Sequence, residues 1–149
     1  MDIHQYLTLL GRHLGIKNLT LDKNQVCRIC LNQGFDVFIE PEPHRHFIHL
    51  YSVLGKIPED GKQAIFEAIF DRNLFGKETD EFVIQCDIQA QEILLSAVIK
   101  PNHLTADYFT QLFDRFVEHF KRHQAWIIGF NTLDQSPQMI TPINPALLV

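Results

Sequence analysis

Apolar residues near the N-terminus recur at three- and four-residue steps, the spacing of one face of an α-helix. They are Ile3, Tyr6, Leu7, Leu10 and Leu14. Asp2 stands where an N-cap residue is expected, and Gly15 follows the last apolar position, where helices commonly end. The pattern therefore predicts a first helix over residues 3–14.

Between Leu19 and Leu54 the pattern changes to short runs rich in β-branched and aromatic residues, separated by polar turn residues. The runs are LTLD, VCRICL, DVFIE and HFIHLYSVL. Their length and spacing predict an antiparallel meander of strands.

The second half of the chain predicts two helices with two strands between them. Pro58 as first helical residue, with Glu59 and Asp60 in the first turn, opens a helix that should end near the sequence NLFG. The apolar residues of this helix are Ile65, Phe66, Ile69 and Phe70. The runs EFVIQCDI and EILLSAVIK read as strands.

The third and longest helix should be capped by Thr105 or a near neighbour. Its apolar face is Phe109, Leu112, Phe113, Phe116, Val117 and Phe120. From Asn131 onward, Pro137, Pro142 and Pro145 argue against regular structure. We therefore predict one α+β domain over residues 1–130, with a mainly antiparallel β-sheet and three helices, and a flexible tail over residues 131–149.

The composition narrows the class of protein. The chain has 149 residues, about the size of one domain, and 13 Lys and Arg against 18 Asp and Glu give a formal net charge of −5. This charge has the sign of a phosphate backbone, which argues against nucleic acid as a partner. Neither a signal peptide nor an apolar run of membrane-spanning length is visible, so we expect a cytoplasmic protein without membrane insertion. Three cysteines in such a chain predict reduced thiols.

The sequence CRIC places Cys27 and Cys30 at the spacing of a redox pair or half of a zinc site. Inside a strand, however, these two side chains point to opposite faces. His44, His46 and His49 lie at a plausible distance along the chain, but their spacing differs from the usual zinc pattern. We therefore expect no catalytic residue, no metal and no cofactor.

A second histidine pair, His119 and His123, lies one helical turn apart and could chelate a metal. Lys121 and Arg122 stand between the two histidines. We interpret the segment as a solvated basic end of the third helix, because positive groups are favourable near a helix C-terminus.

The strand HFIHLYSVL is largely apolar on both faces. Either helices cover both faces of the sheet, or they lie mainly on one face. In the second arrangement Phe38, Phe47 and Tyr51 form an apolar patch that a second subunit or another protein must cover.

Three stretches resemble the class I type III secretion chaperones, the Tir chaperone-like family of Gram-negative bacteria. They are LTLLGRHLGIKNLTLDKNQVCRICL, LYSVLGKIPED and DRNLFG. The predicted order α-β-β-β-α-β-β-α is also that of the family, and the resemblance extends from about Met1 to Trp126.

The resemblance implies a homodimer without ATPase activity that holds the N-terminal region of a secreted effector in an extended, export-competent form. The secretion-system ATPase is a further partner that it allows. We expect the effector-binding surface to consist of Phe38, Phe47, Tyr51, Ile3 and Leu7. We expect the dimer interface to include Phe66, Phe70, Phe82 and Ile84.

Two alternatives stay open on the sequence alone. The first is a zinc- or thiol-dependent enzyme that uses Cys27, Cys30 and the His44–His49 cluster. The second is a binding module of the same fold that serves an assembly other than secretion.

Overall fold

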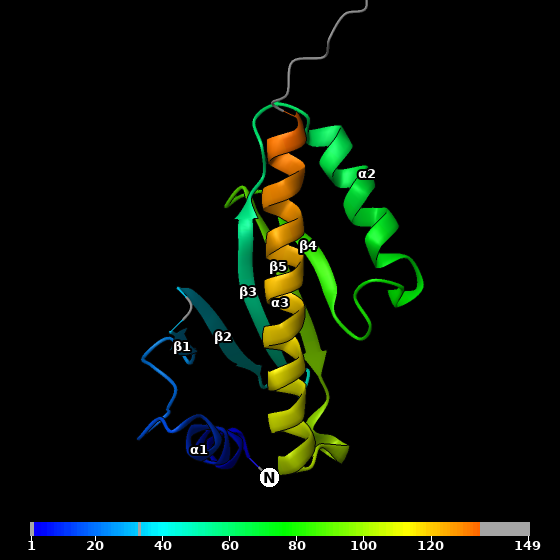
Figure 1. Ribbon diagram of the computed structural model, residues 1–149. Helices are drawn as coiled ribbons and strands as arrows, with labels where there is room; N and C mark the ends of the chain where they lie inside the picture. The colour runs from blue at the N-terminus through cyan, green and yellow to red at the C-terminus, as the bar shows by residue number, and fades with distance from the viewer. Residues whose placement is uncertain (1, 33, 135–149) are drawn as a thin grey trace, which may run out of the picture.

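The computed structural model describes residues 2–32 and 34–134. The chain forms three α-helices, five strands and two short 3₁₀-helices, which confirms the predicted α+β class and element order (Figure 1). In chain order they are α1 (Ile3–Leu14), β1 (Cys27–Leu31), β2 (Phe35–Glu42), β3 (Phe47–Lys56), α2 (Lys62–Asn73), η1 (Leu74–Gly76), β4 (Val83–Asp87), β5 (Glu92–Ile99), η2 (Pro101–His103) and α3 (Ala106–Asp134).

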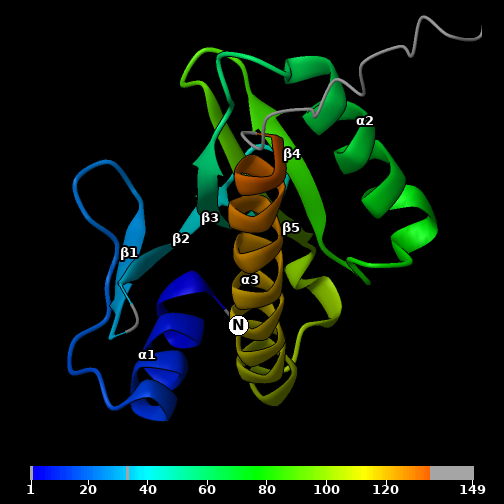
Figure 2. The ribbon, with the colours of Figure 1, turned by 45° about the horizontal axis from the view of Figure 1, so that its top comes forward.

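The five strands form one antiparallel sheet in the order β1-β2-β3-β5-β4, so β1 and β4 are its edges. Alternate residues along β2, β3 and β5 are buried on one face of the sheet, where α1 and α3 lie (Figures 1 and 2). The long helix α3 crosses this face and packs on β3, while α2 lies beside β4. No helix covers the opposite face in the described part of the chain, so the second of the two predicted arrangements is confirmed.

The core between α3 and the sheet is aromatic. Phe120 of α3 stacks on Phe35 of β2 with ring centres 4.0 Å apart, and Phe116 and Phe82 form a T-shaped pair with ring centres 5.4 Å apart. The predicted apolar face of this helix is buried except for Val117, which is half-buried. Thr105 caps the helix as predicted, because its hydroxyl oxygen accepts a hydrogen bond from the Tyr108 N–H at 3.2 Å.

Helix α1 begins and ends where the sequence predicts. The Asp2 carboxylate accepts from the Gln5 N–H at 2.9 Å, and the Gln5 side chain accepts from the Asp2 N–H at 3.0 Å, which completes a capping box. After Gly15 the chain turns back onto the helix at Gly11. A Cβ atom at this glycine would lie 2.8 Å from the Ile16 carbonyl oxygen, so the close approach requires glycine.

One predicted strand is absent, and one predicted helix begins later than expected. The run LTLD, Leu19 to Asp22, is not a strand, because the Asp22 carboxylate accepts from the N–H groups of Asn24 and Val26 and closes a turn. Helix α2 begins at Lys62 and not at Pro58. Gly61 precedes it with a φ of 76°, a left-handed conformation that a helix cannot continue through.

At the other end of the chain, α3 continues to Asp134, four residues beyond the predicted boundary at residue 130. The first predicted tail residues are therefore helical. Pro137, Pro142 and Pro145 lie outside the described residues. None of the helices within residues 2–32 and 34–134 has the length and apolar character that a membrane span requires.

Candidate functional site

The uncovered face of the sheet carries the aromatic pair that the alternation of β2 and β3 predicts. Phe38 and Tyr51 are paired in register and stack with ring centres 5.2 Å apart and planes inclined by 16°. The Tyr51 hydroxyl donates to Glu40 at 3.1 Å, and burial together with this carboxylate raises the pKa of Tyr51 to about 12. The pair therefore presents a neutral, half-buried aromatic surface to solvent.

Phe47 lies apart from this pair, at the beginning of β3. His49 stands between Phe47 and Tyr51 on the same face of the strand and forms a hydrogen bond with Glu42 at 2.8 Å. Two cations flank the Phe47 ring, Arg45 at 5.1 Å and Lys100 at 5.9 Å from its centre. The three aromatic residues predicted to form one patch are thus divided into an apolar pair and a ring bordered by positive charge.

The first helix does not contribute to the uncovered face. Leu7 is 0% exposed and belongs to the core, and Ile3 is half-buried against the same core on the covered side of the sheet. The prediction that Leu7 offers a contact surface is wrong, because helical periodicity identifies an apolar face without saying that the chain's own sheet covers it.

The outer edge of β1 is open. Within the described chain, the backbone groups of Cys27–Leu31 bond only to β2, apart from the Leu31 carbonyl, which accepts from the Gly34 N–H at 3.0 Å. The other edge differs, because Asn73 at the end of α2 bonds both backbone groups of Ile84 in β4, at 2.8 and 2.9 Å. Strand addition is therefore easier at β1 than at the centre of β4.

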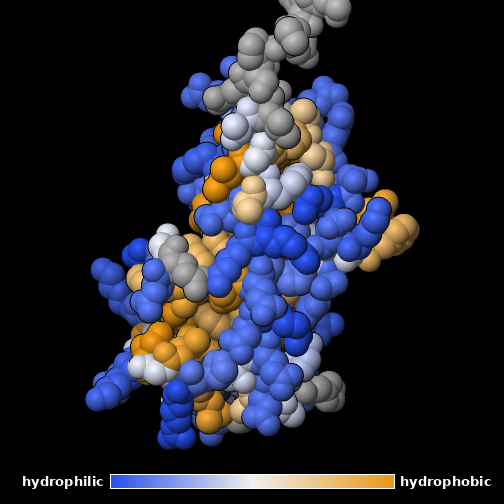
Figure 3. Space-filling model, viewed as in Figure 1, coloured by the Kyte–Doolittle hydropathy of each residue, from blue (hydrophilic) through white to orange (hydrophobic). Residues whose placement is uncertain are grey.

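An apolar surface that the strand and helix patterns of the sequence do not predict borders this open edge. Its side chains are half-buried and come from the end of α1, the loop that follows it and the end of β1: Leu14, Ile16, Leu19, Leu21 and Leu31. Figure 3 shows apolar surface gathered over this end of the molecule. The signal in the sequence is the apolar content of the loop IKNLTL, which a solvated connector does not need.

A second apolar surface lies between α2 and β4, where a dimer interface was predicted. Phe70 is 72% exposed and Phe66 half-buried, so both can contact another molecule. Phe82 and Ile84 are buried in the chain's own core, and their prediction as interface side chains is wrong. Because side chains alternate along the strand, Val83 is exposed in place of its neighbours Phe82 and Ile84. Ile88, in the turn after β4, is exposed as well.

Phe75, in the short helix η1, is the most exposed apolar side chain of the described residues, at 98%. Its backbone is left-handed, with φ 56° and ψ 22°, a conformation that costs a bulky L-residue about 1–2 kcal/mol. Leu74, the first residue of the same short helix, is also exposed, at 52%. Apolar surface projects from the side of the molecule where α2 ends (Figure 3). The sequence NLFG predicts the end of a helix and gives no indication of this exposure.

The cysteines and the N-terminal histidine cluster do not converge. Cys27 is buried and Cys30 exposed, on opposite faces of β1, as predicted. Burial and the Asp22 charge raise the pKa of Cys27 to about 11, and a hydrogen bond to Asp36 raises the pKa of Cys30, so both favour the thiol. No three His, Cys, Asp or Glu side chains within the described chain gather in a way that could hold a metal ion.

The second histidine pair is buried, so its interpretation as a solvated helix end is wrong. His119 and His123 lie in the middle of α3, in line with Phe116 and Phe120. His119 bonds Asp80 at 3.0 Å, whereas neither ring nitrogen of His123 has a hydrogen-bond partner in the described part of the structure. Burial and the positive charges of neighbouring groups lower the pKa of His123 to about 4.

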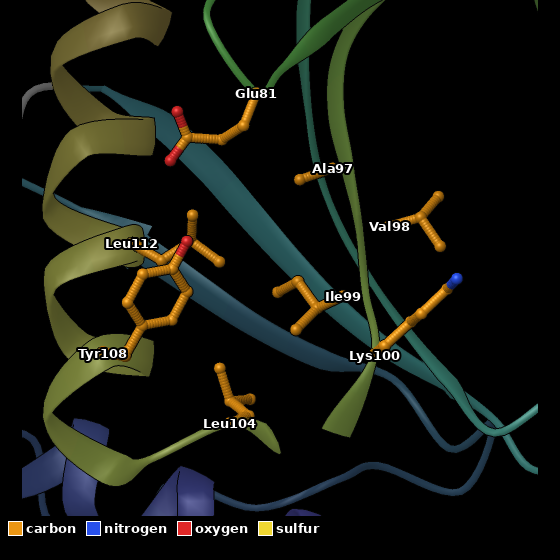
Figure 4. A pocket seen from close by; sticks show the side chains of 8 residues that line it. All are labelled: Glu81, Ala97, Val98, Ile99, Lys100, Leu104, Tyr108 and Leu112. Carbon is orange, nitrogen blue, oxygen red and sulfur yellow. The ribbon is translucent and has the colours of Figure 1, made fainter. Parts of the chain in front are cut away.

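A small hollow lies where β5 extends beyond β4, beside the first turns of α3 (Figure 4). Leu104, Leu112 and Ile99 form apolar walls, while Glu81 and Tyr108 also border it. The Glu81 carboxylate is already paired with Arg115. The volume of about 260 Å³ is below the usual range of ligand pockets, so this hollow is a weaker candidate than the two apolar surfaces.

Comparison with known proteins assigns the family. Residues 5–124 match the model of the Tir chaperone protein (CesT) family, and the chain belongs to that family. No curated protein sequence matches the chain significantly.

Solved structures with the same fold are distant in sequence. A chain of the HopA1–SchA chaperone–effector complex has a TM-score of 0.65 and 13% identity, with 81% of this chain and 91% of that chain covered. A chain of the Yersinia pestis type III secretion chaperone SycH in complex with a YscM2 fragment has a TM-score of 0.62 and 12% identity, with 81% and 98% covered. The E. coli protein YbjN, described as a proposed transcription regulator, has a TM-score of 0.62 and 12% identity, with 85% and 92% covered. At these identities the likeness shows the fold alone.

Proposed function

We propose that this protein is a type III secretion chaperone that binds the N-terminal region of a secreted effector, its client, in an extended form. The client stays soluble and export-competent in the cytoplasm of a Gram-negative bacterium, and no catalytic step is involved. Family membership supports the proposal, as do the chaperone complexes among the structures of the same fold. The observation that carries it is the open edge of β1 with apolar surface beside it.

An extended client segment can add to β1 as a sixth strand. Backbone hydrogen bonds then satisfy the free N–H and C=O groups of the edge whatever the client sequence, while side chains alternate between the two faces. On the covered face they meet the apolar surface that includes Leu19, Leu21 and Leu31. On the uncovered face they meet Arg28, behind which Phe38 and Tyr51 are stacked.

A comparison of the free energies involved shows why client binding needs the apolar surface as well as the strand edge. Along the five residues of β1, about one hydrogen bond per residue contributes roughly 5 kcal/mol in total. Ordering five client residues costs roughly 5–10 kcal/mol of backbone entropy. The ladder alone does not give stable binding, and buried apolar area at about 25 cal/mol per Å² supplies the difference.

The same proposal includes a homodimer formed through the surface between α2 and β4. Phe66 and Phe70 of α2 take part as the sequence predicts, with Val83 and Ile88 in place of the two core residues. This surface lies at the opposite edge of the sheet from β1, so each protomer can bind client and partner together. Delivery of the client to the secretion-system ATPase is the step that would follow.

Co-purification from the native cell tests the function. The tagged protein should carry a stoichiometric partner that mass spectrometry identifies as a secreted effector, bound through its N-terminal region. Phe38→Ala should weaken this binding about thirtyfold or more, because truncating a well-packed aromatic contact costs about 2 kcal/mol.

Ile128→Ala is the matched control, since it truncates an exposed apolar side chain on the far part of α3 and should bind as wild type does. Recovery of a partner that is not secreted would reject the secretion function and favour a binding module of another assembly. Equal binding by Phe38→Ala and wild type would reject the aromatic pair as a contact surface.

A further inference from the structure

Phe75 combines two unfavourable properties in one residue. Its ring is almost fully exposed, and its backbone adopts the left-handed conformation that glycine adopts without strain. Gly76 follows with a φ of 65°, so two successive left-handed residues turn the ring away from the chain. A glycine at position 75 would satisfy the turn, and the side chain is therefore best explained by something outside the chain that contacts it.

A hollow lined in part by Asn73, two residues before Phe75 in the sequence, has a size and lining suited to an aromatic ring. It lies between α2 and β4, with a volume of about 510 Å³, and Phe66, Phe70, Val83 and Ile88 are among the residues that line it. None of its nine lining residues is charged. This volume is within the range of pockets that enclose small organic molecules.

The walls of the hollow are held together by Asn73. Its side-chain oxygen accepts from the Ile84 N–H at 2.9 Å, and its amide nitrogen donates to the Ile84 carbonyl at 2.8 Å. These two bonds fix the end of α2 against β4, two residues before Phe75. The start of the segment that carries the exposed ring is therefore held to the hollow's own wall.

A surface that contains both a projection and a matching hollow fits a second copy of itself. In a two-fold dimer each contact occurs twice, so each protomer offers its ring and receives one. Phe66 and Phe75 lie on either side of Phe70, four and five residues away. If two α2 helices pair antiparallel about Phe70, the ring of each copy lies opposite the Phe66 end of the other.

The exposed area is sufficient for this role. An aromatic side chain buries 150–250 Å², so Phe70 and Phe75, at 72% and 98% exposure, can bury about 300 Å² in each protomer. Leu74, the chain neighbour of Phe75, is also exposed, as are Val83 and Ile88, which line the hollow with Phe70. Together they supply a large part of the roughly 800 Å² per partner of a standard interface.

We propose that Phe75 is the anchor of self-association, and that the ring of each copy inserts into the hollow between α2 and β4 of the other. This inference rests on the homodimer proposed above and names the residue on which it depends. A client segment in the same hollow would leave the projecting ring uncovered, so a second copy is the better occupant.

Phe75→Gly separates the two properties of the residue, because it removes the ring and relieves the backbone. Sedimentation equilibrium over a range of concentrations should give a dimer dissociation constant at least about thirtyfold higher than that of wild type. At concentrations where both proteins are monomeric, the variant should unfold at an equal or higher temperature. Val83→Arg, which puts a charge at the rim of the hollow, should weaken the dimer similarly, and Ile128→Ala should leave it unchanged.

Each other outcome overturns the inference in a distinguishable way. A Phe75→Gly protein as dimeric as wild type rejects the anchor and leaves the dimer standing. A wild-type protein that stays monomeric at high concentration rejects the dimer as well. Lower thermal stability of the monomeric variant means that the Phe75 ring packs on its own chain. Loss of client binding with an intact dimer means that the client, and not a second copy, contacts this surface.

Discussion

Replacing His123 with leucine tests how the junction between α2 and α3 depends on pH. The His123 ring is fully buried and its two nitrogens lack hydrogen-bond partners among the described residues. The groups that face it come from three elements: Arg72 of α2, Glu78 of the turn before β4, and His119 and Arg122 of α3. Burial and the positive charges of the neighbouring groups, Arg72 first, lower its pKa to about 4 from the ordinary value near 6.5, while the Glu78 backbone opposes this shift.

The sign of the effect follows from the lowered pKa. Below pH 6.5 the unfolded chain takes up a proton at His123 that the folded chain does not, so stability is complete above pH 6.5 and is lost as the pH falls towards 4. The two pKa values differ by about 2.5, which corresponds to roughly 3 kcal/mol of free energy of unfolding.

Urea denaturation at pH 7.0 and 4.5, at one fixed protein concentration, measures this contribution. Between the two pH values wild type should lose about 2–3 kcal/mol more than His123→Leu, because leucine keeps an apolar side chain and has no proton to bind. At pH 7.0 the variant should be at least as stable, since two unpaired buried nitrogens are removed. His4→Gln, an exposed site on α1, is the control and should follow wild type. The same loss in His123→Leu as in wild type would refute the reasoning.

Two further substitutions separate structural from contact roles. Asn73→Ala removes the side-chain partner of both backbone groups of Ile84. Urea titrations should show a free energy of unfolding lower by about 1–3 kcal/mol. An unchanged midpoint would show that other contacts hold α2 against β4. Leu7→Ala should lower the free energy of unfolding by about 2–5 kcal/mol, because it opens a cavity in the core. The folded protein should still bind client with wild-type affinity in calorimetry. A loss of affinity in the folded variant would show that α1 belongs to the contact surface.

The periodicity of apolar residues predicts most helices and strands, because the buried face of a helix repeats every 3.6 residues and that of a strand every two residues. It failed where local hydrogen bonds compete, as at Leu19–Asp22, where a carboxylate closes a turn. His119 and His123 were misread because of the charged residues between them. A signal was available, since both continue the apolar stripe of Phe116, Phe120 and Ile127 at helical spacing.

The candidate surfaces were only partly predictable, for a different reason. Alternation along two strands places Phe38 and Tyr51 on one face, and antiparallel register makes them neighbours. Which strands are edges depends on β5 inserting between β3 and β4, which no local pattern encodes. The exposure of Phe75 depends on the left-handed backbone conformation of two successive residues. Phe rarely adopts this conformation, so the sequence does not predict it.

Amide hydrogen exchange in β1, compared between the free protein and the co-purified client complex, tests the central claim most directly. The outer N–H groups of β1 have no partner among the described residues of the free chain, and an added client strand would bond them. We therefore predict slower exchange across Arg28–Cys30 in the complex, with the exchange of the buried turns of α3 unchanged. Identical exchange of β1 with and without bound client would contradict strand addition at this edge.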